Sequence, residues 1–304
     1  MEQATAPASS NDDTLWLAVS EDGLLRARVA RTTELVREAI RRHQPAPLGQ
    51  KALARALSAA AVFPVDWGKI DRVSIQWSGG GPMGSVFAEL REPGTLRARL
   101  TQPAAQPRSP LSGERRGAGL GLLPGGFISV LRQAPKGSHQ HGQVPLRNGE
   151  VDEDLEAYFE ASEQVTTRVR ALSAFHDDEL THAAGLLVQA LPGAEDVQLV
   201  DAEAIERLDP AATPELWLQA LLGRPFRVLE SCPLSFQCAC GRERAAAGIS
   251  LLEQEELIEM VVRDKGADVT CEFCNENYRF SADELLAILD EKMAQTSTRD
   301  GGEA

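Results

Sequence analysis

The chain has 304 residues, of which 43% are hydrophobic and 25% are charged. This composition is typical of a folded, water-soluble protein and excludes collagen-like, fully disordered and membrane-spanning classes. The 31 lysines and arginines are outnumbered by 45 aspartates and glutamates, which gives a net charge of −14. Such a surface repels phosphate backbones and argues against nonspecific nucleic-acid binding.

The first part of the chain predicts two short strands followed by two helices. Residues 15–19 and 25–29 have strand composition, and the turn sequence Ser-Glu-Asp-Gly joins them. Residues 33–43 and 48–63 are rich in Ala, Leu and Arg and predict helices on either side of a proline-containing break.

Strand patterns then dominate up to residue 131. Apolar residues alternate with polar ones over 73–77 and 86–90, and a glycine-rich turn separates the two runs. Residues 96–100 and 127–131 predict further strands, and the Pro-, Gly- and Arg-rich stretch 102–126 between them predicts a mobile surface loop. A helix is predicted over 151–162. Strands joined by turns, without regular crossover helices, indicate an α+β fold with a largely antiparallel sheet.

The pattern changes from residue 177 onward. Apolar residues at helical spacing predict a helix over 180–191, and residues 202–208 and 213–222 predict two more short helices. In the last of them, Thr213 is the expected N-cap and Gly223 the expected end. Helices this short need other parts of the protein to pack against, so we interpret this region as a connecting linker.

All five cysteines lie between residues 232 and 274. No leader sequence or spanning segment is apparent, so the expected location is the cytoplasm, with no membrane partner. In a reducing compartment clustered cysteines indicate metal or redox chemistry. Cys238 and Cys240 form one close pair, and Cys271 and Cys274 form a second, which together supply the four thiolates of a tetrahedral zinc site.

The segments around these cysteines predict a small α+β module. A helix is expected to start at Ser250, with Glu253 completing a capping box, and Ser281 and Glu284 predict the same motif for a helix through Leu289. The last residues, 293–304, are expected to form a flexible tail. Two small helices make too small a core to fold well without the ion. Zinc also keeps thiols in the oxidisable thiolate form, so the residues permit a switch in which oxidation expels the metal.

Other candidate residues favour plain structural interpretations. Cys232 is followed by a proline and is surplus to a four-ligand site, so we interpret it as a bystander. His139 and His141 are interpreted as surface residues of a loop. The glycine runs lack a phosphate-loop ending, and no nucleophile-elbow pattern marks a catalytic serine.

Several stretches of the sequence are similar to one chaperone family. They are residues 236–244 (FQCACGRER), 269–275 (VTCEFCN), 278–280 (YRF), 158–164 (YFEASEQ) and 185–192 (GLLVQALP). On these residues the chain resembles the redox-regulated chaperone family known as the 33-kDa heat-shock protein, over nearly its whole length. Gly241, where the family often has serine, and the extra thiol of Cys232 depart from the family pattern.

The resemblance implies a function and a mechanism. One zinc per chain would be bound in the reduced, inactive form by Cys238, Cys240, Cys271 and Cys274. Oxidative stress combined with unfolding stress would form the disulfides Cys238–Cys240 and Cys271–Cys274, release the zinc and destabilise the linker. The protein would then hold unfolding client proteins without ATP and associate as a homodimer. The expected client-binding residues are the apolar ones of the linker: Leu186, Leu187, Leu191, Leu216, Trp217, Leu221 and Leu222.

This interpretation divides the chain into four parts. They are a core domain (1–176), a metastable helical linker (177–231), a zinc-binding redox-switch domain (232–292) and the tail (293–304). Two alternatives remain, a thiol-disulfide oxidoreductase that uses Cys271 and Cys274, and a structural zinc ribbon that binds nucleic acid. The second conflicts with charge, because residues 232–304 contain 7 Lys and Arg against 15 Asp and Glu.

Overall fold

The computed structural model describes residues 13–92, 94–106, 122, 125–194, 199, 208–209 and 211–300, without the side chains of residues 92, 136 and 294–300. It divides into two compact units, Met1–Gln237 and Cys238–Ala304. Each unit has its own apolar core, as expected when sequence-adjacent elements pack mainly with each other.

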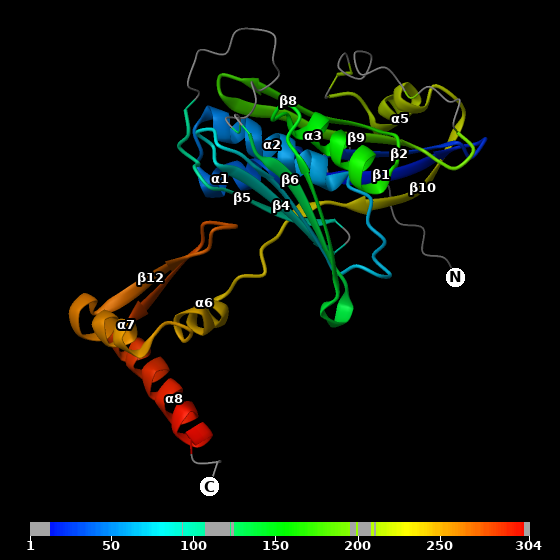
Figure 1. Cartoon of the computed structure of the whole chain (residues 1–304). Coiled ribbons are helices and arrows are strands. Elements are labelled where there is room, and N and C mark those ends of the chain that lie inside the picture. The colour runs from blue at the N-terminus through cyan, green and yellow to red at the C-terminus, as the bar shows by residue number, and fades with distance from the viewer. Residues whose placement is uncertain are drawn as a thin grey trace, which may run out of the picture. The chain divides into compact units, whose positions relative to one another are not determined.

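The first unit contains two sheets (Figure 1). One is antiparallel and five-stranded, in the order β10-β1-β2-β9-β8, and consists of β1 (Thr14–Ser20), β2 (Leu25–Arg31), β8 (Thr167–His176), β9 (Glu179–Ala190) and β10 (Phe226–Pro233). The other is six-stranded, in the order β11-β5-β4-β3-β6-β7, and consists of β3 (Arg72–Ser78), β4 (Ser85–Glu92), β5 (Thr95–Leu100), β6 (Phe127–Gln133), β7 (His139–Pro145) and β11 (Ser235–Phe236). Its neighbours are antiparallel except β11 and β5.

Helix α2 (Pro47–Ala61) forms the centre of the first unit. It contacts β8 and β9 of one sheet and β4 and β5 of the other (Figure 1). A helix covered on all sides needs apolar or small residues all round, which its Ala- and Leu-rich sequence supplies. Helices α1 (Thr33–His43) and α3 (Val151–Tyr158) pack beside it, and a π turn, η3 (Phe159–Glu163), extends α3. A 3-10 turn, η2 (Pro135–Gly137), precedes β7.

Helix α5 (Pro214–Leu222) covers β2 of the five-stranded sheet. Its N-cap is Thr213, whose hydroxyl accepts a hydrogen bond from the backbone N–H of Leu216, and Gly223 ends it with φ of 59°. Both features confirm the sequence prediction. Trp217 of this helix is fully buried together with Leu186 and Val188 of β9.

The helix predicted over 180–191 is wrong, because these residues form β9. This strand lies between β2 and β8, and both of its faces are covered. Leu186 faces the core that contains α5, whereas Leu187 belongs to the core around α2. A strand buried on both faces reads as a continuous apolar run and loses the alternation that identifies a strand.

Strands β7, β8 and β10 were not predicted. The histidines assigned to a loop, His139 and His141, lie on β7, at the edge of the six-stranded sheet. The other predicted strands and helices of residues 14–163 are present, and the fold class, α+β with largely antiparallel sheets, is confirmed. Most of the loop predicted over 102–126 and of the helix predicted over 202–208 lies outside the described residues.

The second unit is a small α+β module. It contains α6 (Arg242–Ile249), α7 (Gln254–Glu259), the π turn η4 (Met260–Asp264), the hairpin of β12 (Gly266–Thr270) and β13 (Asn277–Ser281), and α8 (Ala282–Asp300). Its core consists of few fully buried apolar side chains: Ile249, Leu257, Phe280, Leu285 and Leu289.

Two helix boundaries in this unit differ from the prediction. Ser250 ends α6 and does not start a helix; the capping box is formed by Glu253 and Glu256 at the start of α7. The capping box of Ser281 and Glu284 is confirmed, but α8 continues past Leu289 to Asp300, into the predicted tail. The first unit ends at Gln237, six residues after the predicted end of the linker at residue 231. The functional limits of the linker stay a prediction. Among the described residues, no helix is both long and apolar enough to cross a membrane.

Candidate metal centre

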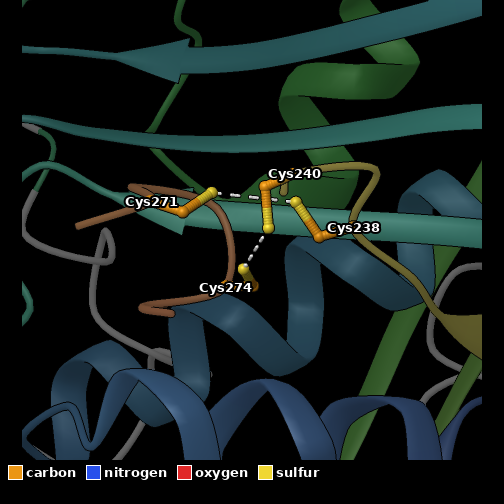
Figure 2. A group of neighbouring side chains, drawn as sticks. All are labelled: Cys238, Cys240, Cys271 and Cys274. Atoms are coloured by element: carbon orange, nitrogen blue, oxygen red, sulfur yellow. Dashed lines mark hydrogen bonds between the residues drawn. The ribbon is translucent and has the colours of Figure 1, made fainter. Parts of the chain in front are cut away.

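Four cysteines of the second unit converge on one point (Figure 2). Cys238 and Cys240 lie in the segment before α6, and Cys271 and Cys274 lie in the turn between β12 and β13. All four Sγ atoms lie within 4.8 Å of one another. Two contacts link the pairs, at 3.7 Å between Cys238 and Cys271 and at 3.2 Å between Cys240 and Cys274.

Backbone hydrogen bonds shape the turn that carries the second pair. The N–H of Cys271 donates to the carbonyl of Glu276 (2.9 Å), and the N–H of Asn275 donates to the carbonyl of Cys271 (2.8 Å). Asn275 has φ of 58°, a left-handed conformation that asparagine tolerates better than most residues. The turn therefore folds back directly after Cys274, and its last residues return to pair with β12.

The first pair is connected to the same hairpin through side chains. The guanidinium of Arg242, at the start of α6, lies 4.4 Å from the centre of the Phe280 ring and donates to Glu284 at 2.6 Å. These contacts tie the residues after Cys240 to β13 and to the first turn of α8. The position of the first pair thus depends on elements more than thirty residues further along the chain.

Hydrogen-bond donors point at three of the sulfurs. The hydroxyl of Tyr278 donates to Sγ of Cys240 at 3.1 Å. Backbone N–H groups of Phe273 and Cys274 donate to the sulfur of Cys271, and that of Glu276 donates to Cys274. Sequence reasoning gave Tyr278 no role at the sulfurs, because only the pairing of β13 with β12 brings its ring there.

Both burial and the hydrogen-bond donors around the sulfurs shift the thiol pKa values. Burial raises the pKa of both Cys271 and Cys274, and backbone N–H donors oppose that shift. The hydrogen bond to Cys240 raises the pKa of Tyr278. Four sulfurs at these separations suit a divalent metal ion, whose charge keeps coordinating thiols deprotonated.

The residues fit a tetrahedral metal ion. Sulfurs that surround a tetrahedral ion at a metal–sulfur distance of ~2.3 Å lie ~3.8 Å apart, and the sulfur–sulfur distances of 3.2 and 3.7 Å are close to that spacing. The donors are four thiols, the set used by closed structural sites, in which no position is left for a substrate. The cluster therefore has the ligands for a metal ion that supports the fold.

The fifth cysteine belongs to the first unit. Cys232 lies on β10, opposite Leu15 of β1, and its Sγ contacts the carbonyl of Pro233 at 3.4 Å. Burial raises the pKa of this thiol. Cys232 is not among the four clustered cysteines, as the sequence analysis expected.

The expected client-binding residues have very different exposures. Leu186 and Leu187 are buried in β9, and Trp217, Leu221 and Leu222 are buried in α5. Leu191 is half-buried. Leu216 is 54% exposed and is the only one of the seven that is open to solvent in this conformation.

Comparisons with known proteins agree over nearly the whole chain. A family model described as "Hsp33 protein" matches residues 13–281. The chain is 34% identical to the 33 kDa chaperonin of Bacillus licheniformis (92% of this chain, 99% of that protein) and 31% identical to that of Bacillus subtilis (92% and 99%). The crystal structure of the 33 kDa chaperonin from Thermotoga maritima superposes with a TM-score of 0.84 at 26% identity, over 93% of this chain and 100% of that one.

Proposed function

The chain belongs to the Hsp33 protein family, and from that membership we propose that it is a redox-regulated holdase chaperone. It is inactive while reduced and zinc-bound, and oxidation activates it to bind unfolding proteins without ATP. The observation that carries the proposal is the cluster of four thiols in a unit with a small apolar core. A core of this size gives little stability by itself, so the state of the sulfurs controls the fold.

Zinc is the metal that we propose for the cluster, one ion per chain in the reduced form. Cys238, Cys240, Cys271 and Cys274 would hold it, and it would keep their sulfurs ionised and connect the two turns. The hydroxyl of Tyr278 and the backbone N–H groups of the turn orient and stabilise these sulfurs. Such supporting donors typically contribute substantially to metal affinity.

Oxidation would convert the four thiolates to two disulfides. We assign them to Cys238–Cys240 and Cys271–Cys274, in line with the family resemblance. Each pair of thiolates gives up two electrons as its S–S bond forms, and one hydrogen peroxide molecule takes up these electrons and two protons to become two water molecules. Disulfide sulfurs are poor metal ligands, so the two turns come apart and the second unit loses its fold. Because the contacts at 3.2 and 3.7 Å join sulfurs of different pairs, peptide mapping of the disulfides in the oxidised protein tests this assignment.

Client binding requires apolar surface that the described conformation mostly covers. We propose that residues 177–231 are destabilised when the second unit unfolds, and that Leu186, Leu187, Leu191, Trp217, Leu221 and Leu222 then join Leu216 at the surface. Most of these side chains are buried in the first unit, so their exposure needs α5 to leave the sheet and β9 to separate from its neighbours. The net charge of −14 keeps such an exposed surface in solution. We further propose a cytoplasmic location and a homodimer in the oxidised form.

The structure offers little support for an oxidoreductase. Reactive Cys-x-x-Cys pairs gain nucleophilicity at a helix N-terminus, whereas Cys271 and Cys274 lie in a turn between two strands. A closed set of four sulfurs also leaves no open position for a catalytic metal. We therefore propose that the protein is not an enzyme, which the absence of turnover on an insulin disulfide substrate would support.

The decisive experiment follows metal and function in one sample. The reduced protein is assayed for zinc, exposed to peroxide at raised temperature, and tested for suppression of aggregation of a thermally unfolding client. We expect about one zinc per chain to be released in step with the gain in holding activity. Cys271→Ser should abolish stable zinc binding, and Cys232→Ser is the matched control that should leave it intact. Full zinc release without any gain in holding would contradict the proposal.

A further inference from the structure

A cavity in the first unit is lined by none of the four clustered cysteines. It has a volume of about 960 Å³ and is lined by β2, by the residues after α2, by β6 and β7, and by the end of α3 with η3. Pockets of this size commonly hold a small molecule or cofactor. The proposed chaperone function does not use it.

The lining is cationic although the protein is strongly acidic. Its charged residues are Arg26, Arg28, Lys69, Arg132, Asp66 and Glu163. Both acids already have partners: Asp66 pairs with Lys69 at 2.8 Å, and Glu163 pairs with Arg132. This pairing leaves the two arginines of β2 without a carboxylate at ion-pair distance among the described residues.

Arg28 is the less satisfied of the two. It is only 8% exposed, and its Nε is buried without a hydrogen-bond partner in the described structure. Glu230 attracts it but lies beyond ion-pair distance. Burial, together with the positive charge of Arg26, lowers its pKa to about 10. A buried cation without an ion pair is unfavourable, and a bound anion would reduce that penalty.

Arg26 and several neutral polar side chains are the remaining polar groups of the cavity. Arg26 donates to the amide oxygen of Gln189 through Nε and a terminal nitrogen, at 2.9 and 2.7 Å. Glu163 attracts Arg26, but the two side chains form no ion pair in the described structure. The hydroxyl of Tyr158 accepts from Arg132 at 2.9 Å and is also hydrogen-bonded to the side chain of Ser162, and His139 and His141 line the same cavity. Arginine forks of this kind bind phosphate groups with paired hydrogen bonds.

We propose that this cavity binds a small molecule that carries two or more linked phosphate groups, with Arg26 and Arg28 as its ligands. Two guanidinium groups that lack an ion pair match a di- or triphosphate better than a single phosphate, and the cavity is far larger than orthophosphate needs. The source is either an inorganic oligophosphate or the phosphate chain of a nucleotide, which share this chemistry. Because the cavity joins β2 of one sheet to β6 and β7 of the other, the ligand would stabilise the first unit.

The test uses the full-length, reduced, zinc-loaded protein and calorimetric titration with tripolyphosphate, ADP and orthophosphate. We expect tripolyphosphate to bind one per chain, about tenfold or more tightly than orthophosphate, and less tightly as salt is raised. Binding of ADP with similar affinity would identify a nucleotide as the source, and tripolyphosphate alone would identify an inorganic oligophosphate. Failure of both to bind would overturn the proposal.

Variants connect the binding to the two arginines. Arg28→Met and Arg26→Gln should each weaken tripolyphosphate binding by about tenfold or more, whereas Arg227→Gln, on the exposed part of β10, removes the same charge elsewhere and should bind normally. Arg28→Met removes an unpaired buried charge, so its melting temperature without ligand should not fall. Zinc chelation by tripolyphosphate would affect the natural protein and the three variants equally. Equal tripolyphosphate affinity in these four proteins would overturn the assignment of Arg26 and Arg28 as ligands.

Discussion

Gly185 of β9 lies directly against the backbone of Ser58 in α2. A Cβ atom at residue 185 would lie 2.0 Å from the carbonyl oxygen of Ser58, well inside contact distance. Only glycine permits the strand to approach the buried helix this closely. The apolar residues that follow, Leu186 and Leu187, are therefore held in the middle of the first unit, and any mechanism that exposes them has to separate β9 from α2.

Gly185→Ala should strongly destabilise the first unit, because backbone atoms of α2 or β9 have to move to admit the methyl group. We expect the loss to be on the order of 3 kcal/mol, in the range of overpacked core sites. All four tryptophans of the chain, residues 16, 67, 77 and 217, belong to this unit, so fluorescence during thermal unfolding reports it alone. Gly68→Ala, in the same unit, is the control, since a Cβ there meets only a side-chain oxygen of the exposed Asp66, at 3.3 Å. Equal melting of both variants would contradict the packing argument.

Leu216 is the residue with which to test client binding without disturbing the reduced fold. Because it is 54% exposed, Leu216→Ser should leave the unfolding temperature unchanged and lower client holding after oxidation. Leu186→Ala, at a fully buried position, should instead cost about 2–5 kcal/mol of unfolding free energy. Light scattering of a heat-unfolded client measures the holding. Normal holding by the oxidised Leu216→Ser protein would remove this side chain from the client-binding surface.

Tyr278→Phe should weaken zinc binding while preserving the hairpin. The substitution removes only the hydroxyl that donates to Cys240 at 3.1 Å, and loss of such a supporting hydrogen bond typically lowers metal affinity by about tenfold. Competition with a chromophoric chelator measures the affinity. The chain's other tyrosine provides the control: Tyr158→Phe removes a hydroxyl that contacts Arg132 in the first unit and should leave zinc affinity unchanged. A zinc affinity of Tyr278→Phe equal to that of the natural protein would mean that the Tyr278 hydroxyl does not support the metal site.

The four clustered cysteines could be predicted from the sequence because each pair is local, and only the meeting of the two pairs depends on the fold. The helices with strong end signals, such as α5 with Thr213 and Gly223, were predictable for the same reason. Strand β9 was not, since burial on both faces removes its alternation. Neither Tyr278 at the sulfurs nor Arg28 in the cavity could be found, because strand pairing and packing place them there.

Asp13 gives the first unit a pH dependence whose sign can be worked out. Its carboxylate accepts the backbone N–H of Leu35 at 2.6 Å near the start of α1, but burial dominates and raises its pKa from 3.8 to about 6. The folded state therefore holds the proton more tightly than the unfolded state. The resulting stabilisation is fully present below pH 3.8 and is lost as pH rises through about 6.

Asp13→Asn keeps an acceptor for Leu35 and cannot ionise. Its stability relative to the natural protein should therefore increase between pH 4 and pH 7, by on the order of 2–3 kcal/mol. Tryptophan-monitored urea unfolding across this range measures the difference. Asp13→Ala separates the two roles of the carboxyl: it should show the same pH trend but be less stable than Asp13→Asn by about 1 kcal/mol at every pH, because it also removes the cap. A difference that stays constant with pH would show that Asp13 ionises normally in the folded protein.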